Sequence, residues 1–441
     1  MQLFNELGDE IETLWRDANY NEELFPAIAA DALKRARLSE KVSAWEVLEW
    51  TLRQDELPRQ KDVSGRFGDP PVTLFTAPRF YIDVYFWIDG TTSIHQHSFC
   101  GAFQVLLGSS IHSWYEFERS ESINFFTEIG EIKLKLCSLL EMGDVQEIRA
   151  GRQYIHSLFH LDRPSATIVV RTGESPLFLP QFSYHKPYLA LDPFFEHATT
   201  TKKLHAISAL LRLQHPDIDR LITELLEKSD FQTAFSILTA LHGRMQSNNL
   251  EQLFNVTAAP GRFERFLETV RRRHGEKAGI FAEVFAHKEM ENDIVRKRNF
   301  ITDPEHRFFF ALLLNLEGKE HIFPLIKQRF PECDPLEKVL DWTFDLAQTR
   351  IAGARKQNAL GFETFDDVDL SLLEKLLRDK TVEEIRSDVR EEYKAEKLEK
   401  VLREIDARIA KIDEAVIFRP LLAGRRLSLS LSIADGDVRV P

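Results

Sequence analysis

The spacing of apolar residues changes twice along the chain and divides it into three parts. In residues 1–60, apolar side chains such as Phe4 and Leu7 recur three and four positions apart, which predicts amphipathic helices. Residues 61–192 contain short β-branched and aromatic runs separated by Gly, Asp and Pro, which predict an antiparallel sandwich or barrel. Helical spacing returns in residues 193–441. The pattern predicts a multidomain α and β protein, with a short helical segment before the β domain and a large all-α domain after it.

Five runs within the β domain have the composition and length of strands. They are residues 79–89, 103–118, 131–143, 144–150 and 166–172. Polar and apolar residues alternate in the run KLKLCSL (133–139), as expected for a strand with one buried face.

Helical spacing is clearest in four segments of the all-α domain. They are residues 205–214, 217–228, 231–243 and the long, charged stretch 382–416. Another helix is expected after Asp303, a residue suited to cap a helix, and Pro304, a residue suited to its first turn. The tail, residues 425–441, alternates Leu and Ser and predicts a single strand that pairs with a sheet elsewhere.

Composition excludes several classes of protein. The 441 residues carry a net charge of −13, which argues against a broad surface for nucleic acid or for an anionic membrane. No run is apolar enough to span a bilayer, and the N-terminal stretch does not resemble a signal peptide. Cys100, Cys137 and Cys333 have no CxxC spacing, which fits a reducing compartment. We therefore expect a cytoplasmic protein that binds neither nucleic acid nor membranes.

Two histidines stand one residue apart in the run SIHQHSF. Because residues i and i+2 of a strand face the same side, His95 and His97 are expected to project together. If that side is the interior of a barrel, the pair supplies two ligands of a metal site. Otherwise they are ordinary surface or hydrogen-bonded core histidines. A third ligand must come from another strand, and His156 and His160 occur in the following β segments.

The residues around these histidines resemble the two motifs of the cupin superfamily. The first motif contains a Gly, an HxH pair and a closing Gly, which correspond here to Gly90, His95, His97 and Gly108. The second motif contains two Gly residues, a His and an Asn, which correspond to Gly143, Gly151, His156 and, at the Asn position, His160. The resemblance covers roughly residues 70–175. It implies a cupin-type antiparallel β-barrel in which His95, His97 and His156 bind a metal ion.

Gly101 stands at the acidic position of the first motif, which leaves three histidines and no carboxylate. In this respect the chain resembles the cysteine dioxygenase type of cupin, which binds Fe(II) through three histidines. The run FWIDGTTSIHQH (86–97) is also similar to that family. The resemblance implies Fe(II) as the cofactor, with Zn, Ni or Mn as open alternatives. Gly101 is expected to lie in the site without donating a ligand, so that a Glu there would add one.

Other positions depart from the cysteine dioxygenase type and argue against oxidation of a thiol. The family's Tyr and Ser fall on Gly173 and Val169, and its Cys falls near Ala102, with Cys100 out of phase. Arg171 stands where the family carries a catalytic histidine that is not a ligand. These departures leave the identity of the substrate open.

The resemblance implies a mononuclear non-haem Fe(II) oxygenase, dioxygenase-like, that acts on O2 and a small carboxylate-bearing substrate. Three neutral ligands leave the metal its 2+ charge and open positions for both reactants. Three residues are candidates for catalytic roles. Arg171 can bind the carboxylate, His160 can donate a hydrogen bond behind the ligands or belong to a lid, and Tyr154 is within reach by spacing. The alternatives are a solvated arginine at 171 and simple packing for Tyr154.

Two other functions stay open at this point. The β domain can be a non-catalytic or regulatory metal-binding cupin whose helical domain binds a protein partner, since more than half of the chain lies outside the barrel. It can also be an isomerase or hydrolase that uses a redox-inert metal such as Zn or Mn.

Overall fold

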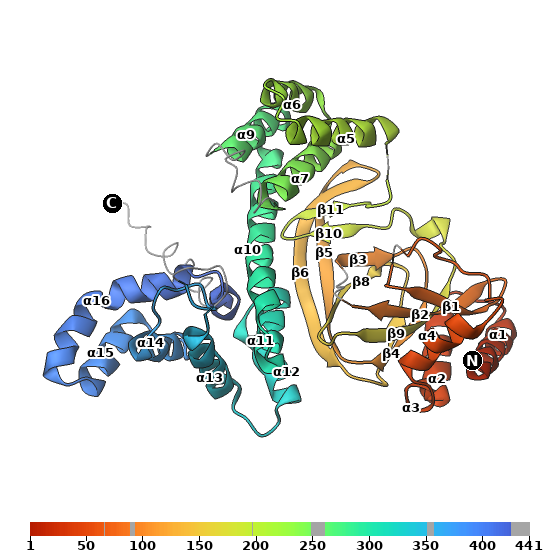
Figure 1. Ribbon diagram of the computed structural model, residues 1–441, viewed down its shortest axis with the longest axis horizontal. Coiled ribbons are helices and arrows are strands. Elements are labelled where there is room, and N and C mark those ends of the chain that lie inside the picture. Colours follow the sequence, from red (N-terminus) through yellow and green to blue (C-terminus); the bar gives the residue numbers. More distant parts are fainter. Residues whose placement is uncertain (66, 89–92, 196, 248–260, 351–356, 425–441) are drawn as a thin grey trace, which may run out of the picture.

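The β domain of the computed structural model consists of two layers (Figure 1). The structure describes residues 1–65, 67–88, 93–195, 197–247, 261–350 and 357–424. The first layer is an antiparallel sheet with the strand order β1 (Pro71–Thr76), β2 (Phe80–Trp87), β9 (Ser165–Thr172), β4 (Gly101–Leu107) and β7 (Val145–Ile148). The second layer closes into an antiparallel barrel with the order β10 (Ser183–His185), β11 (Leu189–Leu191), β6 (Thr127–Leu140), β5 (Ser110–Asn124), β8 (Gly151–His160) and β3 (Ile94–His97). The predicted fold class, an antiparallel β-barrel with a sizeable helical region, is confirmed.

Each of the five predicted runs contains an observed strand, with one difference in residues 103–118. A turn at Gly108 divides that run into β4 and β5, and its φ of +80° favours glycine. The carboxylate of Asp162 stabilises this turn, because it accepts a hydrogen bond from the backbone N–H of Ser109 at 2.7 Å.

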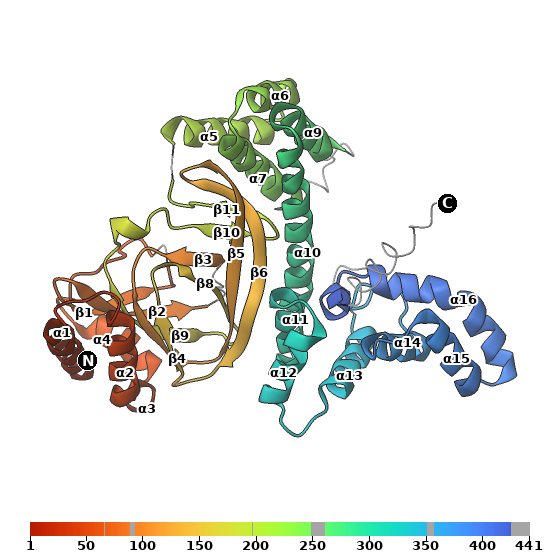
Figure 2. The same cartoon turned by 180° about the vertical axis from the view of Figure 1, so that it is seen from behind.

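The N-terminal helices cover the outer face of the five-stranded sheet, as Figures 1 and 2 show. They are α1 (Gln2–Asp17), α2 (Phe25–Ala36), α3 (Leu38–Lys41) and α4 (Ala44–Arg53). Alternate strand residues such as Ile82 and Ile168 join Phe4 and Phe25 of the helices in one buried cluster. The helical spacing of residues 1–60 therefore serves to bury one side of the sheet.

The inner face of the same sheet looks toward strands of the barrel. Tyr85, Trp87 and Phe103 from this face pack with Tyr154 and Leu158 of β8 in a second buried cluster. The space between the two layers is therefore lined by aromatic side chains, and the predicted site residues lie in it.

The remaining helices follow the barrel in the chain. They are α5 (Ala198–Arg212), α6 (Ile218–Lys228), α7 (Phe231–Ser247), α9 (Arg262–His274), α10 (Ile280–Phe300), α11 (Pro304–Asn315), α12 (Lys319–Arg329), α13 (Pro335–Gln348), α14 (Asp367–Leu377), α15 (Val382–Glu392) and α16 (Ala395–Glu414), with short 3₁₀ turns η1 (Pro176–Phe178) and η2 (Glu276–Gly279). The helices α10, α11 and α12 lie beside the long β5–β6 hairpin, and α13 to α16 lie on their far side (Figure 1). One cluster joins Ile111, Leu139 and Phe159 of the barrel to these helices.

The start of α11 agrees with its prediction. The carboxylate of Asp303 accepts a hydrogen bond from the backbone N–H of His306 at 2.9 Å, and Pro304 occupies the first turn. The charged stretch 382–416 instead forms two helices, α15 and α16, because the backbone is extended at Tyr393 and Lys394.

Two predictions lie outside the described residues. They are the C-terminal strand in residues 425–441 and the place of Gly90 in the first cupin motif. Among the helices that the structure describes, none combines the length and the apolar character needed to cross a membrane.

Candidate metal centre

The strand pairing brings the three predicted ligands to one place. His95 on β3 is paired with His156 on β8, so these two side chains start from neighbouring backbone positions. His95 and His97 lie on the face of β3 that looks toward the five-stranded sheet. Gln96, between them, points to the other side, where its Oε1 accepts a hydrogen bond from the Tyr184 hydroxyl at 2.6 Å. The shared face predicted for the two histidines is therefore present.

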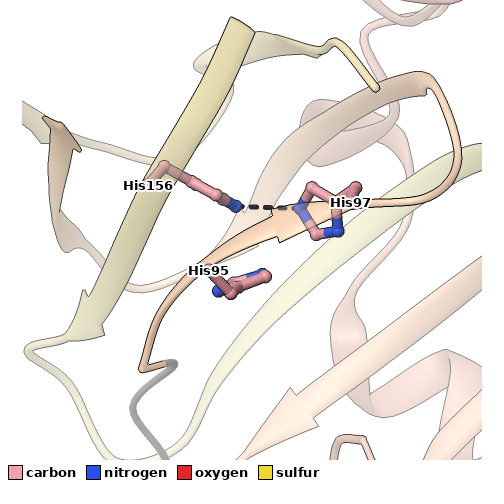
Figure 3. Close-up of side chains that lie close together, drawn as sticks. All are labelled: His95, His97 and His156. Carbon is pink, nitrogen blue, oxygen red and sulfur yellow. Dashed lines mark hydrogen bonds between the residues drawn. The ribbon is translucent and has the colours of Figure 1, made fainter. Parts of the chain in front are cut away.

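Figure 3 shows the three imidazoles converging from β3 and β8. Their exposed fractions are 7, 6 and 5% for His95, His97 and His156. One ring nitrogen from each lies within 4.8 Å of the others, and the Nε2 atoms of His97 and His156 are 2.9 Å apart. Two ligands at right angles around one ion, each about 2.1 Å from it, lie about 3.0 Å apart. The spacing of these two nitrogens therefore fits a shared ion.

The donor set also fits a metal ion. The Nδ1 atom of His95 lies 2.7 Å from the carbonyl oxygen of Ser93, and because a carbonyl only accepts, Nδ1 carries the proton. The Nε2 atom of His95 then carries no proton and offers a free lone pair. It is buried and has no hydrogen-bond partner. A buried polar atom without a partner costs free energy, and a cation bound there would satisfy it. Within the described residues, no other group of three His, Cys, Asp or Glu side chains converges in this way.

The protein environment keeps these imidazoles neutral. Burial lowers the pKa of His95, and it lowers the pKa of His97 and of His156 well below the ordinary value. Neighbouring histidines lower the pKa of His97 and of His156 further. The charge of Arg171 also lowers the pKa of His97. Since a metal ion binds the neutral ring, the environment favours the form that can act as a ligand.

Tyr154 lies against the three histidines. Its ring centroid is 4.3 Å from that of His156, and its side chain is 4% exposed. Its hydroxyl points to Nε2 of His112 at 3.0 Å. The predicted proximity of Tyr154 to the site is therefore present, whereas its hydroxyl contacts a histidine outside the predicted set.

A fourth histidine, His112, contacts the group, although the cupin pattern has no ligand at this position and His112 is not among the three converging residues. Its Nε2 atom lies 3.1 Å from Nδ1 of His156, and its side chain is buried. Burial lowers the pKa of His112 to about 3, so it too is neutral. The signal in the sequence was the spacing of His112 and Trp114, which places both on one face of the strand beside β8.

Arg171 points into the space between the layers, but Phe99 separates it from the histidines. The guanidinium carbon lies 3.3 Å from the centroid of the Phe99 ring, and the Phe99 ring lies 4.3 Å from that of His97. The arginine is therefore placed at the border of the site, one aromatic ring away from a predicted ligand.

His160 lies further along β8 and makes a different set of contacts. Its ring stacks on Trp87 with 4.7 Å between centroids, and its Nδ1 lies 2.8 Å from the Ser165 hydroxyl. Its Nε2 is buried and has no hydrogen-bond partner among the described residues. His160 thus lines the interlayer space without joining the group of three.

Gly101 does not have the place that the motif comparison gave it. It is paired with Ile148 on one side and Arg171 on the other, and a Cβ atom there would lie 1.9 Å from the carbonyl oxygen of Val170. A glutamate at this position therefore cannot reach the histidines as a ligand, because its first carbon meets the backbone of β9. The expectation that Glu at 101 would add a carboxylate ligand is wrong.

The close backbone contact predicts a folding defect in Gly101→Ala. Ordinary overpacking lowers the free energy of unfolding by about 1–3 kcal/mol. We expect a larger loss for this variant, because the backbone of β4 or β9 must move. Urea unfolding followed by circular dichroism measures it. Gly173→Ala is the matched control, since no atom lies within 4 Å of a Cβ at that glycine. Equal stability of the two variants would show that β4 and β9 are further apart.

Comparisons with known proteins add little to this geometry. No family model matches the chain, and no curated protein matches it. Solved structures include cupin-type proteins as weak, partial matches. The capsular polysaccharide assembling protein CapF from Staphylococcus aureus matches with 18% identity over 27% of this chain and 29% of its own, at a TM-score of 0.18.

Two further neighbours have similar scores. A recombinant oxalate oxidase in complex with glycolate shares 16% identity over 28% of this chain and 61% of its own, at a TM-score of 0.19. The DMSP lyase DddQ from Ruegeria pomeroyi DSS-3 shares 15% identity over 40% of this chain and 93% of its own, at a TM-score of 0.21. The chain spans less than two thirds of the CapF and oxalate oxidase chains. The account of the site therefore rests on this chain's own geometry.

Proposed function

We propose that the β domain binds one divalent metal ion through His95, His97 and His156. We further propose that, with Fe(II), the protein is a mononuclear non-haem oxygenase acting on a small carboxylate-bearing substrate. The observation that carries the proposal is the convergence of three buried, neutral imidazoles without a carboxylate among them. Imidazole ligands suit Fe(II), and they also suit Zn or Ni, so the identity of the metal is part of the proposal.

The surrounding side chains suit the binding of a small anion. A bound Fe(II) would supply the one-electron chemistry that activation of O2 requires. Arg171 is partly buried and fixed by Phe99, and its guanidinium can hold a carboxylate through two parallel hydrogen bonds. Aromatic side chains of the five-stranded sheet are buried beside the site and give the substrate an apolar surrounding. In this proposal Tyr154 and His160 border the substrate, and neither is a ligand.

The proposal is tested on protein purified without O2. Metal analysis is expected to give about one iron per chain, and nitric oxide is expected to produce an EPR signal of an iron–nitrosyl species. Addition of small carboxylates should then cause O2 uptake measured with an electrode. Stoichiometric zinc or manganese with no O2 uptake would instead support the redox-inert alternative, and a metal-free protein that takes up no metal would refute the site.

A second function is favoured by the size of the helical part. The largest buried cluster lies mainly in α10 to α16, outside the β layers, and it includes Phe309 and Leu373. A regulatory metal-binding cupin with a helical surface for a protein partner agrees with this observation. It predicts stoichiometric metal without O2 uptake for any substrate.

A cytoplasmic location belongs to the same proposals, because the three cysteines are free.

A further inference from the structure

A row of three side chains leads from the protein surface to His156. The indole N–H of Trp114, a residue that is 36% exposed, donates a hydrogen bond to Nε2 of His112 at 2.8 Å. The same nitrogen of His112 lies 3.1 Å from Nδ1 of His156. The row depends on the register of two strands, because Trp114 on β5 is paired with His156 on β8.

The direction of these hydrogen bonds follows from which atoms can donate. An indole nitrogen can only donate, so the Nε2 atom of His112 is an acceptor and carries no proton. The contact between Nε2 of His112 and Nδ1 of His156 then requires the proton to be on Nδ1 of His156. A neutral imidazole has one ring proton, so the Nε2 atom of His156 is left with a bare lone pair.

That bare nitrogen is the one that faces the other ligands. The Nε2 atom of His156 lies 2.9 Å from Nε2 of His97, inside the converging group. The opposite tautomer would place a proton there and block binding of a cation. The Tyr154 hydroxyl also lies beside this contact, 3.0 Å from Nε2 of His112.

We propose that His112, oriented by Trp114, is a positioning residue that fixes the tautomer of His156 so that its Nε2 can bind the metal ion. This inference rests on the proposed metal site. Histidine ligands are commonly oriented by a hydrogen bond at their second ring nitrogen, and loss of such a partner typically lowers metal affinity 10–100-fold.

The tautomer can be measured without metal, by long-range ¹H–¹⁵N NMR of histidine-labelled apoprotein, with His156 assigned from His156→Gln. In the unsubstituted protein we expect His156 to carry its proton on Nδ1. In His112→Phe, we expect a mixture of tautomers and a zinc affinity about 10–100-fold lower, measured by competition with a chromophoric chelator. In His112→Gln, the amide oxygen can accept from Nδ1, so both properties should be largely restored.

His242→Phe is the matched control, because His242 is another buried histidine that loses one hydrogen bond, to Glu289 in the helical domain. Its zinc affinity should equal that of the unsubstituted protein. A proton on Nε2 of His156 in the unsubstituted apoprotein would overturn the inference, and so would an unchanged zinc affinity in His112→Phe. Failure of the unsubstituted protein to bind zinc would instead refute the metal site, and the tautomer of the apoprotein would still decide on the role of His112.

Discussion

Replacement of His95, His97 or His156 by alanine is expected to abolish stoichiometric metal binding. Each substitution leaves two of the three converging nitrogens. Loss of an indirect partner already costs 10–100-fold in affinity, so we expect a loss of more than about 100-fold for a direct ligand. Metal analysis after dialysis, followed by titration of the apoprotein with Zn²⁺, measures the effect.

The control for this series is His242→Ala. His242 is 2% exposed and lies on α7, where it contacts Glu289 instead of the three histidines. This variant should retain the metal content of the unsubstituted protein, and the three ligand variants should keep their circular dichroism spectra. Full metal content in any folded ligand variant would exclude that histidine from the site.

The substitution Phe309→Ala is expected to give a large loss of stability in the helical domain. Phe309 has no exposed surface and packs 5.3 Å from the Trp342 ring, in the cluster that also contains Phe159 of the barrel. Removing a buried Phe side chain costs about 3–5 kcal/mol, because transfer free energy is lost and a cavity remains. Urea unfolding monitored by circular dichroism and tryptophan fluorescence measures the loss.

Phe344→Ala provides the comparison, since Phe344 is on α13 and 46% exposed. Its effect should stay below about 1 kcal/mol, as for most surface substitutions. Because the cluster of Phe309 extends into the barrel, both optical signals should shift together in Phe309→Ala. A loss of less than about 1 kcal/mol in that variant would show that Phe309 is not packed as described.

Periodicity was sufficient to predict several elements of the fold and the face shared by His95 and His97. The spacing of His95 and His97 fixed their common side, because side chains in a strand alternate. Asp303 and Pro304 marked the start of α11 for an equally local reason. The partnership with His156 needed the motif resemblance, since periodicity does not show which strands pair.

Two features depended on contacts between distant residues: the contact of His112 with His156 was not predicted, and the place of Gly101 was predicted wrongly. His112 lies 44 positions from His156, and only the pairing of β5 with β8 brings their nitrogens together. Gly101 looked like a ligand position that had lost its acid, whereas the close approach of Val170 requires the absence of a side chain there. In both cases the missing information was the register between strands, which one sequence does not contain.

The most direct test of the metal site is X-ray absorption spectroscopy of the protein loaded with one equivalent of Zn²⁺. We predict three imidazole nitrogens in the first coordination shell at about 2.0–2.1 Å, and two imidazoles in His156→Ala if that variant is loaded at high zinc. Zinc avoids oxidation during the measurement and uses the same imidazole ligands. A shell with one imidazole or none, or one containing sulfur, would contradict a site built from His95, His97 and His156.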